Sequence, residues 1–101
     1  MNIEIRYFDD CPNWKPVQTL ITEITEEIGV GAEVVLTIVD TPALAERLSF
    51  RGSPTVVIDG IDPWDNPDAP IGLSCRVYRT EEGFSGSPTT VQLREAIEAA
   101  R

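Results

Sequence analysis

Cys11 and Cys75 are the two thiols of the chain, and no histidine accompanies them. The absence of histidine removes Ser-His-Asp and Cys-His catalytic groups and every zinc site that uses histidine. Two cysteines are also too few for a structural zinc site, so we expect no resident metal. Chemistry in this chain must therefore use thiols or carboxylates.

Cys11 lies in a polar break between a predicted strand and a predicted helix. A thiol at a helix N-terminus faces unpaired N–H groups and the positive end of the helix dipole, which favour the thiolate. Lys15 adds a positive charge, whereas Asp9 and Asp10 disfavour a second negative charge. Cys11 is therefore the first candidate nucleophile, and the alternative is a buried cysteine that packs as a small apolar side chain.

The spacing of apolar residues predicts the elements that position these side chains. Alternation or short apolar runs predict strands over residues 2–8, 33–39, 55–58 and 74–78. Helical spacing with start and stop signals predicts helices over residues 17–28, 42–48 and 90–100, the last with a capping box at Thr89. The chain is thus one α/β domain over residues 1–101 with the order β-α-β-α-β-β-α. Glu4 and Arg6 are unexpected in its first strand, because a central strand covered on both faces is apolar on both.

The connection from Gly60 to Gly72 is longer than a hairpin loop usually is. Asp62, Asp65 and Asp68 recur every third residue there, whereas a calcium-binding EF-hand loop uses alternate positions and a closing glutamate. We therefore expect no calcium site, and we expect Trp64 to pack against the core.

This order of elements resembles the thioredoxin and glutaredoxin superfamily over nearly the whole chain. Cys11-Pro12-Asn13-Trp14 lies where that family carries its Cys-x-x-Cys motif. Ser53-Pro54-Thr55 opens the third strand, where the family carries a cis-proline that faces the active cysteine. The resemblance implies a thioredoxin-like fold of three layers, with a mixed four-stranded sheet.

The resemblance also implies a site. Cys11 would be the catalytic thiol, and the substrate would contact Pro12, Asn13, Trp14, Ser53, Pro54 and Thr55. In the family, the exposed backbone before the cis-proline pairs with an extended peptide or with glutathione. Trp14 stands where a dithiol enzyme has its second cysteine, so the usual resolving thiol is missing. We therefore expect a monothiol thiol–disulfide oxidoreductase without a bound cofactor, resolved by glutathione as a co-substrate or by a protein thiol.

Cys75 lies near the start of the predicted fourth strand. In the resembling topology this places it too far from Cys11 for a disulfide, which needs Cα atoms within about 7 Å. We expect a core cysteine on the face of Val77. The alternative is a second thiol that resolves Cys11 or shares a soft ion such as mercury or copper(I) with it.

Two other functions remain open. The chain could be a redox-inactive binding module that kept the fold without its chemistry, or a protein that handles soft metals or organomercurials through Cys11 and Cys75.

The charge of the chain bears on its partners. The net charge is −9 and the pI is about 4.3, which disfavours nucleic acid and anionic membrane surfaces. The N-terminus alternates like a strand instead of following a signal peptide's order. We therefore expect a cytoplasmic protein whose partner is a small molecule or a protein with a thiol, and the sequence does not indicate an oligomeric state.

Overall fold

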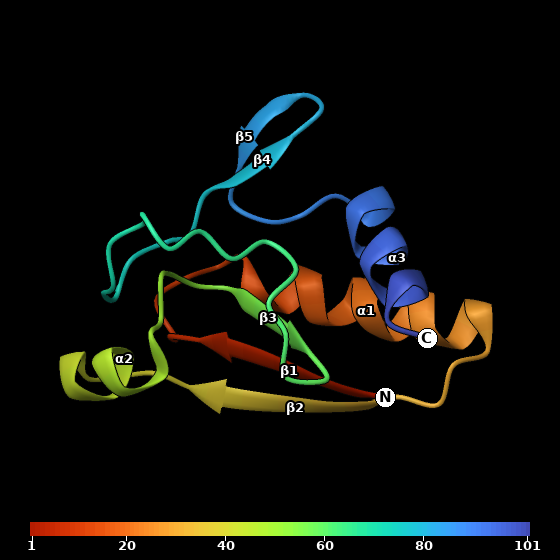
Figure 1. Ribbon diagram of the computed structural model, residues 1–101, viewed down its shortest axis with the longest axis horizontal. Coiled ribbons are helices and arrows are strands. Elements are labelled where there is room, and N and C mark those ends of the chain that lie inside the picture. The colour runs from red at the N-terminus through yellow and green to blue at the C-terminus, as the bar shows by residue number, and fades with distance from the viewer.

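Three strands and three helices of the computed structural model, which describes residues 1–101, lie where the apolar spacing predicts them. Two further short strands form a hairpin that stands apart from the main sheet (Figure 1). In chain order the elements are β1 (Asn2–Tyr7), α1 (Trp14–Ile28), β2 (Glu33–Ile38), α2 (Pro42–Leu48), β3 (Thr55–Ile58), β4 (Tyr78–Thr80), β5 (Gly83–Ser85) and α3 (Thr90–Ala99). None of the helices combines the length and the apolar character needed to cross a membrane.

β1 is the central strand of a mixed sheet with the order β2-β1-β3. It runs parallel to β2, as the connecting helix requires, and antiparallel to β3. In this register Ile5 lies between Leu36 of β2 and Val56 of β3. The sheet thus ends, at the C-terminal end of β1, beside the loop that carries Cys11.

α1 and α3 cover one face of this sheet (Figure 1). The stripe predicted for α1 is buried there, and Gly29 ends the helix with φ 73°. α3 begins with the predicted capping box, in which Thr89 and Gln92 satisfy each other's backbone N–H groups. The buried core between sheet and helices consists of Ile3, Ile5, Val17, Ile21, Ile24, Val56, Ile58, Leu93 and Ile97.

The opposite face of the sheet explains the two charges in β1. Glu4 and Arg6 form an ion pair of 3.1 Å; Glu4 also accepts a hydrogen bond from Thr37, and Arg6 donates to the carbonyl of Leu48. α2 lies beyond the ends of β1 and β2, not across this face (Figure 1). The expected third layer is therefore absent along β1, and its polar side chains reach partners at the sheet surface.

The predicted fourth strand over residues 74–78 does not join the sheet, which has three strands instead of four. The segment makes one parallel bridge, between Ser53 and Cys75, and regular strand begins only at Tyr78, which pairs with β5. We attribute this to Arg76, because its buried side chain is held by Asp62 in the connection from Gly60 to Gly72. This anchor keeps the segment at the start of β3 instead of alongside it.

Candidate functional site

The two thiols meet at the C-terminal end of β1. The Cys75 thiol donates to Cys11 Sγ across 3.6 Å, although the residues are 64 positions apart. The expectation that Cys75 lies too far from Cys11 for bridging is therefore wrong. Both cysteines are free, so the structure presents a reduced pair.

Cys11 is held by the loop between β1 and α1. Its backbone N–H donates to the carbonyl of Phe8 at 3.1 Å, and its thiol lies 3.3 Å from the carbonyl of Ser53 as a donor. The residue is only 1% exposed. The sulfur of Cys11 is therefore closed to a substrate in this conformation, and the Cys75 sulfur lies against it.

Cys75 is held from both sides in the sequence. Ser53 donates its N–H to the carbonyl of Ser74 at 2.8 Å and accepts from the N–H of Arg76 at 2.9 Å. Gly52 allows this approach, since a Cβ there would lie 2.8 Å from Arg76 Cα. Cys75 and Val77 are both exposed, so the expectation of a core cysteine on the face of Val77 is wrong. The backbone beside Cys75 is held by Ser53, while the thiol stays open to solvent.

Arg76 anchors the same segment through its side chain. Its guanidinium bonds Asp62 at 2.7 Å, the hydroxyl of Thr55 at 3.3 Å and the carbonyl of Trp64. It also lies 4.7 Å from the ring centre of Tyr78, whose hydroxyl donates to the carbonyl of Pro54. The connection from Gly60 to Gly72 therefore helps to position the segment that carries Cys75.

The Ser53–Pro54 bond is cis, as the resemblance implies. The surroundings differ from the expectation, because Ser53, Pro54 and Thr55 are all buried. Both backbone groups of Ser53 are bonded to the Ser74–Arg76 segment. The chain itself therefore occupies the backbone position that we expected a substrate to use.

The remaining predicted contacts surround Cys11 without facing one cavity. Pro12 is exposed, and the Asn13 side chain packs against Gly86. Trp14 stacks on Tyr7 with ring centres 4.2 Å apart. Lys15 lies over the Trp14 ring, with its ammonium 5.6 Å from the ring centre. Trp14 therefore acts as a packing residue at the start of α1.

The electrostatics of the pair are uneven. The hydrogen bond to Cys11 raises the pKa of the Cys75 thiol, and its slight burial and the charge of a Cys11 thiolate act in the same direction. The Cys75 thiol is therefore harder to deprotonate than a free cysteine thiol.

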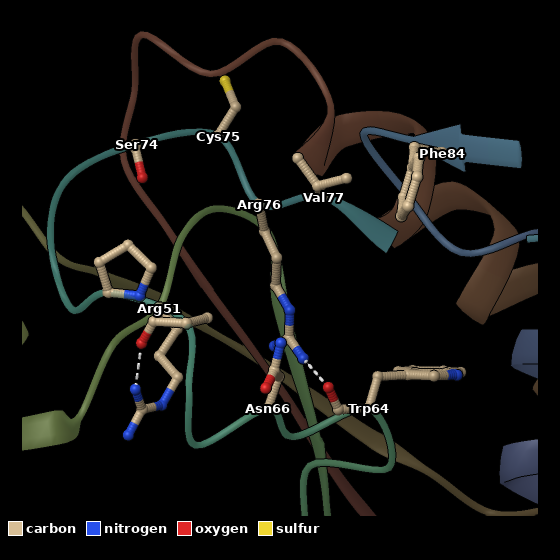
Figure 2. Close-up of a pocket in the computed structure, with 10 residues that line it drawn as sticks. Arg51, Trp64, Asn66, Ser74, Cys75, Arg76, Val77 and Phe84 are labelled. Carbon is tan, nitrogen blue, oxygen red and sulfur yellow. Dashed lines mark hydrogen bonds between the residues drawn. The ribbon is translucent and has the colours of Figure 1, made fainter. Parts of the chain in front are cut away.

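A pocket of about 330 Å³ adjoins Cys75. Figure 2 shows Cys75 at one end with its sulfur turned away from the pocket, Arg76 crossing the middle, and Val77 beside Phe84. Arg51 lies opposite, bonded to the carbonyl of Ala69. The exposed thiol thus borders a pocket with both apolar and cationic walls.

Sequence reasoning missed Arg76, Val77 and Phe84 as members of this site. A signal was present, because an arginine between apolar residues in a predicted strand requires a buried partner. Asp62, in the connection from Gly60 to Gly72, is that partner. The exposure of Phe84 had no comparable signal in the sequence.

No cluster of three or more histidine, cysteine or acidic side chains suitable for a metal is present. The comparisons with known proteins return nothing: no family model, no curated protein and no solved structure matches the sequence. The function must therefore be inferred from the two thiols and their surroundings.

Proposed function

We propose that the chain is a thiol–disulfide oxidoreductase of the thioredoxin-like type whose redox pair is Cys11 and Cys75. The observation that carries the proposal is the distance of 3.6 Å between the two sulfurs. A disulfide bond is about 2 Å long, so a small shift of either side chain closes it. The element order, the thiol after the first strand and the cis bond before Pro54 support the likeness to this fold.

The exposures of the two thiols suggest their roles. The expected mixed disulfide at Cys11 needs an accessible sulfur, and Cys11 is 1% exposed. Cys75 is exposed, so it is the sulfur that forms the bond to a substrate. Cys11 then takes the role of the resolving thiol, which the motif around Trp14 lacks.

The exchange balances as follows. In the oxidised chain, a substrate thiolate attacks Cys75 Sγ, the Cys11–Cys75 bond breaks, and Cys11 leaves as a thiolate. A second substrate thiolate attacks the substrate sulfur of this mixed disulfide and releases Cys75. The chain gains two electrons and two protons, and two substrate thiols become one disulfide. The reverse sequence reduces a disulfide, with Cys11 attacking Cys75 Sγ to release the substrate.

The direct test is a glutathione redox titration with the state of each cysteine read by alkylation and mass spectrometry. We expect wild type to form an intramolecular Cys11–Cys75 disulfide. Cys11→Ser should instead accumulate a glutathione adduct at Cys75, and Ser74→Ala, a neighbouring control, should behave as wild type. If wild type forms glutathione adducts without the internal disulfide, the redox pair does not exist and a binding module is the better description.

The raised pKa of Cys75 gives a second test. Iodoacetamide alkylation of Cys75 in wild type should titrate at a higher pH than in Cys11→Ala, because the variant removes the hydrogen bond and the neighbouring thiolate. Equal profiles would mean that the two thiols do not interact in solution.

The same distance favours a second candidate, binding of a soft ion or an organomercurial by both thiols. With their sulfurs 3.6 Å apart, both thiols can reach one soft ion, and thiolates are the ligands that such ions prefer. Mercury(II) titration with Cys11→Ser and Cys75→Ser tests this function. Stoichiometric binding that survives the loss of either thiol would exclude a shared site.

A further inference from the structure

The segment from Cys75 to Arg79 alternates strictly in exposure. Arg76 and Tyr78 are buried, whereas Cys75, Val77 and Arg79 are exposed. Val77 is 65% exposed. One side of an extended segment thus presents a thiol, an apolar group and a cation at alternate positions.

Around Cys75, the backbone of this segment forms hydrogen bonds on one side only, the side that faces Ser53. Ser53 uses the carbonyl of Ser74 and the N–H of Arg76. The N–H and carbonyl groups of Cys75 and Val77 make no hydrogen bond within the protein. Unpaired groups of this kind form an edge to which an extended chain can add as a further strand.

A groove runs beside this edge. The pocket at Cys75 adjoins a second one of about 400 Å³, and Trp64, Asn66, Val77 and Phe84 line both. Phe84 is 79% exposed and lies beside Val77, and the two side chains form one wall of the groove (Figure 2). This apolar wall next to a thiol suits the side chain of a bound polypeptide.

The charge of the groove differs from that of the whole protein. Arg51, Arg76 and Arg79 line it with one acidic residue, Asp65, although acidic residues outnumber basic ones by 17 to 8 in the chain. Arg76 is paired with Asp62, whereas the guanidinium of Arg79 has no ion pair. A carboxylate on the bound chain therefore has a cation to meet at Arg79.

We propose that this groove binds an extended segment of a substrate protein by strand addition to Cys75 and Val77. The segment carries a cysteine, an apolar residue and an acidic residue at alternate positions, opposite Cys75, Val77 and Arg79. This inference deepens the proposed function and rests on it only for the thiol–disulfide exchange at Cys75. Binding itself requires no redox chemistry.

The binding test uses two peptides in which the cysteine is replaced by alanine, Ala-x-Val-x-Glu and the reverse order Glu-x-Val-x-Ala. We expect one of them to shift the backbone amide resonances of Cys75 and Val77 in the reduced protein. N-methylation of the pairing residues should weaken that peptide about tenfold or more, because the side chains stay and the backbone donors are lost. Equal binding of the N-methylated peptide, or no shift with either order, would overturn strand addition.

Variants test the side-chain assignments. Phe84→Ser should weaken binding of the peptide about tenfold, while Val91→Ser, at another exposed apolar position, on α3, should leave binding unchanged. Arg79→Glu should reverse the preference, so that a peptide with lysine in place of glutamate binds better. Equal effects of Phe84→Ser and Val91→Ser would show non-specific apolar contact and refute the groove.

Exchange kinetics separate this inference from the proposed function. The oxidised protein is mixed with the cysteine form of the peptide or with 2-mercaptoethanol. If the alanine peptides bind but neither thiol reduces the protein, the groove stands and the redox function fails. If both thiols react at similar rates and the alanine peptides do not bind, the redox function stands and the groove fails.

Discussion

Gly52 should be the position where the smallest substitution most disturbs the thiol pair. It has φ +118°, and a Cβ placed on it would lie 2.8 Å from both the N and Cα atoms of Arg76. Real carbon contacts are about 3.5–4.0 Å, so Gly52→Ala forces the two segments apart by more than half an ångström. The bridge from Ser53 then weakens, and Cys75 moves relative to Cys11.

The expected magnitude has two parts. An alanine at this φ costs about 1–3 kcal/mol in backbone strain. The overlap with Arg76 adds about 1–3 kcal/mol, the usual cost of overpacking a closely packed site. Gly52→Ala should therefore lower the free energy of unfolding by about 2–6 kcal/mol, and it should weaken formation of the Cys11–Cys75 disulfide about tenfold.

Gly60→Ala is the matched control. Gly60 has φ +86°, and a Cβ there would meet nothing within 4 Å, so the substitution carries backbone strain alone. Urea unfolding of both reduced variants and glutathione titration of both native variants measure the two effects. If Gly60→Ala and Gly52→Ala are equally destabilised and form the disulfide equally well, contact with Arg76 does not position Cys75.

Three further predictions concern Tyr78, Asp62 and the cap of α3. Burial raises the pKa of Tyr78, so above about pH 10 the unfolded state binds fewer protons, and stability should fall by up to about 1.4 kcal/mol per pH unit. Tyr78→Phe should remove that slope in alkaline urea titrations and should cost about 1–3 kcal/mol at neutral pH, since the Pro54 carbonyl loses its donor; an unchanged slope would contradict it. Asp62→Asn should destabilise the protein by about 3 kcal/mol, because Arg76 stays buried without its counter-charge, and a loss below 1 kcal/mol in urea unfolding would argue against this anchor. Thr89→Ala should cost about 1 kcal/mol by removing the cap of α3, with Thr89→Ser retaining most of it in the same assay.

Local patterns predicted the elements that carry the core. The apolar stripe of α1, the start of α2 at Thr41 and the run Thr55–Ile58 each specify an element through neighbours a few positions away. The capping box at Thr89 is equally local and was also confirmed. Such signals require no knowledge of the rest of the chain.

The fourth strand and the position of Cys75 could not be predicted in this way. They depend on Gly52 approaching Arg76 and on Asp62 holding its side chain, and both contacts join residues far apart in the sequence. Alternation from Cys75 onward was real, but it describes an edge beside a pocket instead of a strand inside the sheet. The pattern gave the conformation and not the partner.

The sequence separation of the two thiols has a consequence for the whole protein. A Cys-x-x-Cys disulfide closes a ring of four residues, whereas a bond from Cys11 to Cys75 would enclose α1, β2, α2 and β3. For a ring of this length, chain entropy alone stabilises the folded state by about 4 kcal/mol. The redox state of this pair would therefore also change the free energy of unfolding. Oxidation would make the protein more resistant to heat and proteases, and reduction would make it less resistant.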